Sequence, residues 1–588
     1  MSLSSIVESL NQHSNDVIEL SPDARKQSGA HYTPRELADF VAKQVIDAWT
    51  RKGIHGPTKI LDPAVGDAEL LDAILHQATG NLSTEFSVYG FDTSQEAIAA
   101  SSNRIHSNHP NIQIQFKCTD FLDHVLSCYA DDETTPLFSK DVGEKYHLVI
   151  ANPPYIRTQV MGADRAQKMA RMFHLAGRID IYYAFLDAVA RVLFPGGIAG
   201  IIVSNRFMTV KSGISIREKL KRQFNILHIW DLGDTRLFEA AVLPSVILLE
   251  RKSDSTFDDP ARFTSIYSTN KQEVSQSVPS PIKALSKHGF VQVDDGKRYF
   301  VSHGFLDYGK EGTGVWRIST EASENYLSIV AGNTSCLFGD LGKVRVGVKT
   351  TADKVFIRSD WDSLPNQSRP ELLRPLLTHH FANNYKANVT ETPRMILYPH
   401  ECINGKRVPV DLTKYPKTAA YLENHREALS SREYIRDSGR KWYEIWVPHD
   451  PDIWSQPKLV FRDISEKPTF WLDLTGSVVN GDCYWLSSQK EKDNLLWLAL
   501  AVANSPFIEW FYDIRFHNKL YAGRRRFMTQ YVEQFPIPHT DTATAKEIIQ
   551  LTKELYQILP SPDSQPLKDK INKLVWYAFG LSPEEIGW

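Results

Sequence analysis

The residues best equipped for chemistry are Asn152, Pro153, Pro154 and Tyr155, which follow the apolar run Leu148–Ala151. Two consecutive prolines stiffen the loop, because proline cannot extend a strand ladder or enter a helix interior. The Asn152 side-chain oxygen and the Pro153 carbonyl are two acceptors that could both face a planar amino group. The Tyr155 ring could stack on the conjugated group that carries it. The same residues are also typical of an ordinary turn at the end of a strand.

Acidic residues stand at the ends of three earlier predicted strands, 58–62, 86–92 and 112–117: Asp62, Asp92 and Asp120. Asp92 could accept hydrogen bonds from both ribose hydroxyls of a nucleoside-like cofactor. Asp120 could accept from an adenine amino group, with Phe121 packing on the ring. Each acid alone could simply cap the next helix. Three in succession upstream of Asn152 indicate ligand binding at the carboxyl edge of a sheet.

The loop Pro63–Asp67 joins the first of these strands to a helix predicted over 69–77. A glycine such as Gly66 lets a ligand's polar groups approach backbone N–H donors at a helix start. A lone glycine is weak evidence, since many such turns bind nothing. Upstream, Thr33 is a natural N-cap with Pro34 at the first helical position, and a helix is predicted over 35–50.

The elements that position these residues form an α/β fold. Seven strands, mostly separated by helices and parallel in pattern, occupy roughly 60–250 and predict a doubly wound sheet. We expect a leader at 1–20, an α/β domain at 21–255 and a linker with peripheral elements at 256–331. A second, α+β domain follows at 332–540, and a helical tail at 541–588 ends the chain.

Two segments of the second half combine cations, hydroxyls and aromatic rings. The first, 342–351, carries Lys343, Arg345, Lys349 and Thr350, and the second, 518–527, carries Lys519, Arg524, Arg525 and Arg526. Such density suits contacts with phosphates. For any single cation a solvated charged face is the alternative. We expect most of the tryptophans of this half to lie in a core, because exposing many large apolar side chains to water is unfavourable.

Bulk properties narrow the class of protein. The chain has 588 residues, 42% hydrophobic and 23% charged, with a formal net charge of −3. Such values are ordinary for a globular protein. Five scattered cysteines without a CxxC pair argue against zinc and disulfides and fit a reducing cytosol. No signal core or membrane span is found, so we expect a cytoplasmic protein without membrane or metal.

Taken together, these blocks resemble the gamma class of S-adenosylmethionine-dependent DNA adenine-N6 methyltransferases of type II restriction–modification systems (TaqI-like). Gly29–Pro34 resembles the N-terminal cofactor motif, Asp62–Asp67 motif I, and Asn152–Tyr155 the catalytic motif, while Asp92 and Asp120-Phe121 fall where motifs II and III carry their acids. The second half resembles the target-recognition domain, notably 342–357 and 534–538.

The resemblance implies a seven-stranded Rossmann-like methyltransferase domain followed by a DNA target-recognition domain. It implies S-adenosylmethionine as cofactor, held by Tyr32, Thr33, Pro34, Asp62, Ala64, Gly66, Asp92, Asp120 and Phe121. It also implies double-stranded DNA as partner and a prokaryotic source.

Two departures from the family pattern stand out. Ala68 replaces a frequent second glycine of motif I, which we expect to cost little at a helix start. Some relatives place an aromatic residue after motif VI, where this chain has Lys211-Ser212-Gly213. Phe207 is the nearby candidate for a second stacking partner.

The expected reaction is methyl transfer to N6 of an adenine flipped out of the duplex. N4-cytosine methylation is an alternative, made weaker by Asn rather than Ser before Pro-Pro. Glutamine and RNA N-methyltransferases also use Asn-Pro-Pro-Tyr, but they are usually smaller and lack a long aromatic and basic second half. A non-enzymatic specificity or DNA-tethering subunit with a relic fold is a further alternative. Such a subunit has no physical need for Asp62, Gly66, Asp92, Asp120 and Asn152, so their presence argues against it.

We also expect no nuclease domain, because the cofactor motifs begin almost at the N-terminus and the recognition domain follows them. Any cleavage then comes from a separate cognate restriction endonuclease. The asymmetric recognition domain is compatible with a monomer.

Overall fold

The computed structural model describes residues 33–54, 56–81, 85–128, 143–155, 163–175, 180–237, 243–253, 259–274, 276–309, 314–388, 392–488, 493–516, 520 and 524–586. The chain divides into two compact units, 1–319 and 320–588. Each is described by itself below.

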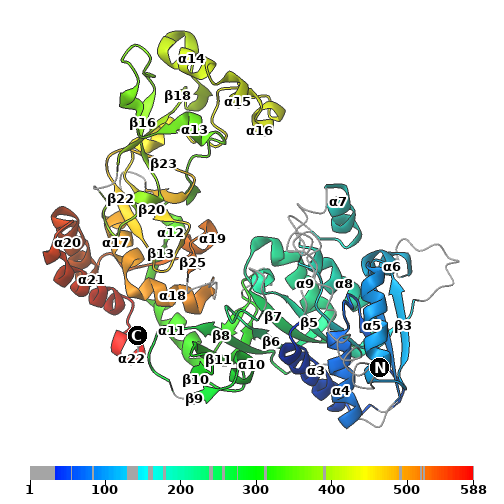
Figure 1. Ribbon diagram of the computed structural model, residues 1–588. Helices are drawn as coiled ribbons and strands as arrows, with labels where there is room; N and C mark the ends of the chain where they lie inside the picture. The colour runs from blue at the N-terminus through cyan, green and yellow to red at the C-terminus, as the bar shows by residue number, and fades with distance from the viewer. Residues whose placement is uncertain are drawn as a thin grey trace, which may run out of the picture. The chain divides into compact units, whose positions relative to one another are not determined.

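The first unit is built on one twelve-stranded sheet (Figure 1). Its first seven strands are β1 (Thr58–Asp62), β2 (Phe86–Asp92), β3 (Gln113–Cys118), β4 (Tyr146–Ala151), β5 (Leu193–Ser204), β6 (Phe224–Asp231) and β7 (Pro244–Arg251). They lie in the order β3-β2-β1-β4-β5-β7-β6, as expected for a Rossmann-like methyltransferase. The strands β1 to β5 run parallel, whereas β7 is antiparallel to both β5 and β6.

Alternating side chains of the strands fill two cores, one on each face of this sheet. Leu148 and Ile150 of β4 pack with the helices α3 (Arg35–Thr50), α4 (Glu69–Asn81) and α5 (Gln95–Asn108). Val149 and Ala151 pack on the opposite face with α6 (Phe121–Cys128), α8 (Ile181–Val192) and α9 (Ile214–Gln223). A short helix, α7 (Ala163–Met172), precedes α8. Because β4 is covered on both faces, its carboxyl end is held firmly at the sheet edge.

The region expected to be a linker with peripheral elements, 256–331, is largely part of this sheet. Strand β8 (Arg262–Ser268) pairs parallel with β6. Beyond it lie β11 (Arg298–Asp307), β10 (Gly289–Val293) and β9 (Gln276–Val278), with β12 (Arg317–Ser319) paired to β11 and the short helix α10 (Pro281–Ala284) nearby in sequence. Val291, Tyr299 and Val301 of this region belong to one of the two buried cores, so the linker expectation was wrong for this part.

The second unit contains several small sheets and a set of helices. One sheet has the order β14 (Arg345–Val346), β24 (Cys483–Ser487), β20 (Lys458–Arg462) and β22 (Phe470–Asp473). Another has β15 (Ile357–Arg358), β17 (Arg394–Leu397), β16 (Leu373–Leu377) and β23 (Val478–Val479). Three two-stranded sheets pair β13 (Thr334–Leu337) with β26 (Pro536–Pro538), β18 (His400–Ile403) with β19 (Lys406–Pro409), and β21 (Ile464–Ser465) with β25 (Arg525–Arg526).

The helices of this unit are α11 (Glu321–Gly332), α12 (Phe338–Leu341), α13 (Asp353–Phe356), α14 (Pro416–Glu423), α15 (Arg426–Ser430), α16 (Glu433–Asp437), α17 (Asp493–Asn504), α18 (Pro506–Phe516), α19 (Thr529–Val532), α20 (Ala543–Ile558), α21 (Gln565–Ala578) and α22 (Pro583–Ile586). Buried tryptophans such as Trp454, Trp471 and Trp485 form a core with the strands, as the sequence predicted. No single described helix is long and apolar enough to cross a membrane. Only the bent pair within α17 and α18 meets that length and composition together, with a 74° break.

Candidate active site

The carboxyl end of β4 delivers Asn152 directly to the edge of the sheet. Its side-chain Nδ2 donates a hydrogen bond of 3.1 Å to the Thr33 hydroxyl, and its Oδ1 accepts one of 3.0 Å from the Tyr155 hydroxyl. Asn152 is thereby fixed from both ends of its amide group. Thr33, which the sequence suggested as a helix cap, makes no such cap, since α3 begins at Arg35 after Pro34 and has no side-chain cap bond.

Tyr155 belongs to a chain of aromatic residues beneath the Asn152 turn. Its ring meets Tyr182 of α8 edge-on, with ring centres 6.4 Å apart, and Tyr182 meets Tyr183 at 4.8 Å. The Tyr182 hydroxyl donates to the Ser204 carbonyl at the end of β5 at 3.4 Å. Burial raises the pKa of the Tyr155 hydroxyl, so this group stays a neutral donor.

Tyr182 and Ser204 are site residues that the sequence analysis did not single out. The available signal was the apolar and aromatic run 181–186 at the start of a helix, which predicted burial but not a neighbour. Phe207 is fully buried and packs edge-on against Trp316 at 5.7 Å. The suggestion that Phe207 stacks on a flipped base was therefore wrong, because its ring is buried in the core.

Asp62 and Asp92 organise the first two loops of the sheet edge. Asp62 Oδ1 accepts from the Ala64 amide at 2.9 Å, while Asp92 accepts from the amides of Gly66 at 3.1 Å and Ser94 at 2.9 Å. Asp62 is buried, and burial, together with the charges of Asp92 and Asp67, raises its pKa to about 7. The loop of motif I is thus tied to the second strand end by a carboxylate.

Gly66 shows room for a ligand beside this loop. Its φ is +51°, and no atom lies within 4 Å of the position that a Cβ would take. Ala68 also has a positive φ, +63°, although it is buried and carries a Cβ. A left-handed conformation disfavours any L-residue other than glycine by about 1 kcal/mol or more, so the expectation that Ala68 costs little at this position was wrong.

Asp120 has a capping role in addition to any ligand role. Its Oδ1 accepts from the Leu122 amide at 2.8 Å at the start of α6, and its Oδ2 pairs with Arg165 of α7. Phe121 is 2% exposed and packs with Phe91 and Phe185. The sequence suggested that this ring packs on the cofactor. In the described residues the ring is instead buried in the core.

The donor and acceptor set at this edge fits S-adenosylmethionine. The carboxylate of Asp92 stands at the end of β2, where ribose hydroxyls bind in such sheets. Space is open at the position of a Cβ on Gly66, and Ala64 is half-buried on the same loop. Tyr32, also assigned to this site, lies outside the described residues.

The predicted DNA contacts of the second unit fall into two groups. Lys343, Lys349 and Arg524 are exposed, whereas Arg345 is half-buried over the Trp485 ring at 5.2 Å. Lys519 lies outside the described residues. Arg526 is partly exposed and forms a two-point pair with Asp463 at 3.1 Å.

Arg525 and Thr350 are structural rather than surface residues. Arg525 is 5% exposed and pairs with Asp513 at 2.7 Å and Glu509 at 3.0 Å. Thr350 is buried, bonds Asp353 through its hydroxyl, and accepts from the Ala352 amide at 3.0 Å. The prediction that these two side chains contact DNA was wrong, because their polar groups are used inside the unit.

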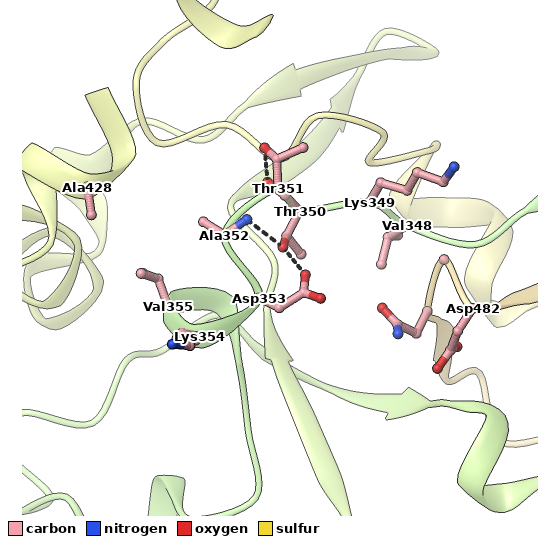
Figure 2. A pocket seen from close by; sticks show the side chains of 12 residues that line it. Val348, Lys349, Thr350, Thr351, Ala352, Asp353, Lys354, Val355, Ala428 and Asp482 are labelled. Atoms are coloured by element: carbon pink, nitrogen blue, oxygen red, sulfur yellow. Dashed lines mark hydrogen bonds between the residues drawn. The ribbon is translucent and has the colours of Figure 1, made fainter. Parts of the chain in front are cut away.

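Figure 2 shows the pocket that the Thr350 turn borders. The pocket measures about 650 Å³ and is lined by residues 348–355, Ala428 and 480–482. The buried guanidinium of Arg432 donates to the Thr350 carbonyl at 2.8 Å and holds the turn. Lys349, Lys354 and Asp482 are among the charged side chains that line this pocket (Figure 2).

One group among the described residues has the spacing of cation ligands: Cys402, Asp450 and Asp452, whose ligand atoms lie within 4.8 Å of one another. Asp450 Oδ1 already accepts from the Asp452 amide at 3.0 Å, as a cap of the following turn. The group is partly exposed and belongs to the second unit.

Comparison with known proteins matches both halves of the chain to family models. Residues 84–238 match the Eco57I restriction-modification methylase, and residues 400–537 match the TaqI-like C-terminal specificity domain. The chain is 39% identical over 575 residues to the type II methyltransferase M.BanIII of Aneurinibacillus aneurinilyticus, covering 95% of this chain and 98% of that protein. It is 24% identical to the type II methyltransferase M.XhoI of Xanthomonas vasicola, covering 96% and 98%.

Solved structures that match parts of the chain include a nuclease-deletion mutant of the type ISP restriction-modification enzyme LlaGI in complex with a DNA substrate mimic. It is 11% identical with a TM-score of 0.49, over 94% of this chain and 56% of that one. The type IIG restriction endonuclease BpuSI is 16% identical with a TM-score of 0.40, over 95% and 67%.

Proposed function

This chain belongs to the type II DNA methyltransferases of restriction–modification systems, and from this premise we propose that the group it methylates is N6 of an adenine. The enzyme methylates DNA with S-adenosylmethionine, which supplies an electrophilic methyl group when bound. The acceptor base is the part of the reaction that the Asn152 turn addresses.

Asn152 carries the proposal. It lies at the end of β4, next in the sheet to β1, with the Asp62 and Asp92 loops on the same edge. Its Oδ1 and the Pro153 carbonyl can accept the two hydrogens of an exocyclic amino group. Accepting both hydrogens favours a pyramidal nitrogen whose lone pair is available, because conjugation with the ring otherwise withdraws it. Hydrogen bonds to Thr33 and Tyr155 fix the rotation of the amide group.

The Tyr155 hydroxyl donates its hydrogen bond to one lone pair of Asn152 Oδ1, and a carboxamide oxygen has two lone pairs. The hydroxyl therefore orients the acceptor without consuming it. A flipped adenine costs on the order of a few kcal/mol in lost stacking and pairing. Stacking on the Tyr155 ring offsets about 1–3 kcal/mol of that cost. Catalysis then rests on positioning and on the acceptors, with no covalent intermediate on the chain.

Asn rather than Ser before Pro-Pro supports adenine over cytosine as the acceptor. The activity is thus proposed to be that of a site-specific DNA adenine methyltransferase, EC 2.1.1.72. We propose that the exposed cations Lys343, Lys349 and Arg524 of the second unit contact the DNA backbone. We propose the same role for the partly buried Arg345 and Arg526. We further propose that the chain acts as a monomer and that a separate endonuclease performs cleavage.

The test is methyl transfer by variants of Asn152. Asn152→Ala should reduce transfer to duplex DNA by at least about 100-fold, as the loss of oriented donors or acceptors does in other enzymes, while cofactor affinity stays within about twofold. Asn152→Asp keeps an acceptor and should retain part of the activity. Transfer of tritium from labelled cofactor to DNA, followed by nucleoside analysis, reads both rate and base.

Parallel reactions with duplex DNA, RNA and a release factor separate the three substrate classes. Label found in N4-methylcytosine would refute the adenine assignment without touching the role of Asn152. A near wild-type rate for Asn152→Ala would refute the role itself.

A further inference from the structure

The loop that follows β5 lies beside the catalytic turn. Strands β4 and β5 are parallel neighbours with Ala151 opposite Ile201, so Asn152 and Ser204 reach the same edge of the sheet. The loop, 204–213, contains two short 3-10 turns, Asn205–Met208 and Lys211–Gly213. Tyr182 joins it to the Tyr155 ring through the Ser204 carbonyl.

Its first half is anchored by a buried hydrogen-bonded cluster. Asn205 Nδ2 donates to Asp231 Oδ1 at 3.0 Å and to the Tyr267 hydroxyl at 3.3 Å. Tyr267 in turn donates to Asp231 Oδ2 at 2.6 Å, and Asp231 is fully buried. Because Tyr267 comes from β8, the sheet extension fixes the start of this loop.

Its second half is anchored by Arg217 of α9. The guanidinium is buried and donates to the carbonyls of Phe207 at 2.6 Å and Val210 at 3.0 Å. A Cβ on Gly213 would lie 2.2 Å from the Phe207 carbonyl, so only glycine allows this close approach. With both halves tied, the loop presents its outward side chains in one backbone conformation.

Arg206 is the outward cation in the first turn of the loop. It is exposed, and among the described residues its guanidinium makes no hydrogen bond or ion pair. Its backbone is fixed, since its amide donates to Ser204 Oγ at 3.4 Å and its carbonyl accepts from Thr209 and Val210. Burial raises the pKa of Tyr182 and Tyr183, and the charge of Arg206 opposes that rise on both, so the cation lies close to this pair.

A nucleotide that is flipped toward the Asn152 turn brings its own two phosphodiesters to the same edge of the sheet. A guanidinium on a rigid turn can bind a phosphate through two parallel hydrogen bonds. We propose that Arg206 binds a phosphodiester next to the target base and thereby holds the flipped nucleotide in place. This inference rests on the proposed function, namely base flipping toward Asn152.

The experiment combines the substitution Arg206→Ala with DNA in which a single flanking phosphate is a neutral methylphosphonate. Arg206→Ala should lower kcat/KM on duplex DNA by about 10- to 100-fold, as expected for a charged hydrogen bond. The slope of log affinity against log salt should fall by about 1. A methylphosphonate at the contacted phosphate should reduce the wild-type rate about as much as Arg206→Ala does. It should reduce the rate of Arg206→Ala by less than about twofold, because the contact is already absent in that variant.

Arg222→Ala is the matched control. Arg222 is also an exposed arginine, but it lies at the end of α9 just before β6 begins, hence at the opposite edge of the sheet. It should leave the rate and the salt slope unchanged. Placing the target base opposite an abasic site lowers the cost of flipping, and it should narrow the gap between wild type and Arg206→Ala.

The inference would be overturned if Arg206→Ala kept the wild-type rate. It would also be overturned if, at each of the two flanking phosphates, the rate loss from the methylphosphonate simply added to the rate loss from Arg206→Ala. Failure of the proposed function gives a different result, because the wild-type chain itself would then transfer no methyl group to adenine. Arg206→Lys keeps the charge but not the two-point geometry, so an intermediate rate is expected if the contact is bidentate.

Discussion

At the scale of single residues, the site depends on how each polar group is oriented. Asn152 gains its orientation from Thr33 and Tyr155, two residues far apart in sequence from each other. Asp92 and Asp120 each satisfy local backbone amides, so their capping and ligand roles coexist. A carboxylate can do both because it has about four lone-pair sites.

Asp62 gives a prediction at this scale. Its ordinary pKa is near 4 and its folded value is about 7, because burial disfavours the charged form. The folded state therefore holds a proton that the unfolded chain releases, and stability falls as pH rises from about 4 to about 7 and then levels off. Asp62→Asn should flatten this dependence.

The measurement is chemical denaturation at pH 5 and pH 8. At pH 8 Asp62→Asn should be more stable than wild type by about 2–4 kcal/mol, at 1.36 kcal/mol per pKa unit. Glu218→Gln, at an exposed carboxylate of α9, is the control substitution. Equal pH dependence in wild type and Asp62→Asn would refute the buried neutral acid.

At the scale of elements, hydrophobic alternation decided most of the architecture. The strand ends of β1, β2 and β4 fall where the apolar runs stop, so the polar residues after them meet at one edge. The basic segment 524–526 shows the limit of such reasoning, because a run of three arginines divides between surface and interior. Arg524, just before β25, is exposed. Within β25, Arg525 is buried and Arg526 is partly exposed, since successive residues of a strand point to opposite faces.

Arg524 and Arg525 should therefore behave differently when replaced. Arg525→Ala removes the buried cation that pairs with Asp513 and Glu509, so we expect about 2–4 kcal/mol of lost stability. Arg524→Ala should leave stability within about 0.5 kcal/mol and lower the salt slope of DNA binding by about 1. Thermal denaturation and fluorescence anisotropy at several salt concentrations measure the two effects. A pure DNA-binding defect for Arg525→Ala would refute its structural role.

At the scale of the whole molecule, the two units carry separable tasks. The first holds the strand-edge site and the second matches a specificity domain. Full-length likeness to type II methyltransferases, at 95% of this chain and 98% of M.BanIII, agrees with a chain that methylates.

The corresponding prediction concerns cleavage. The purified chain with magnesium and cofactor should methylate plasmid DNA and leave it supercoiled, because every task assigned to its residues is methyl transfer or DNA binding. Agarose electrophoresis reads cleavage, and resistance to a matching endonuclease reads methylation. Addition of a chelator should leave methylation unchanged. Linear plasmid in the reaction with magnesium would contradict the separate-nuclease proposal.

The sequence by itself indicated seven strands of an α/β domain between about residues 60 and 250, the tryptophan core of the second unit and the placement of Asn152 and the three acids at strand ends. These features follow from local pattern: apolar runs define strands, and parallel strands bring their carboxyl ends to one edge. Their chemistry was readable because it resides in residue types at loop positions.

Only the tertiary structure decided what each side chain does there. Thr33 orients Asn152 instead of capping a helix, Phe121 and Phe207 are core, and Arg525 pairs with acids. The strands beyond β7 join the sheet, and through Tyr267 they fix the loop that carries Arg206. These outcomes depend on contacts between segments tens to hundreds of residues apart. Pairing and burial at such separations leave no periodic signal in the local sequence, so they become visible only when the chain has folded.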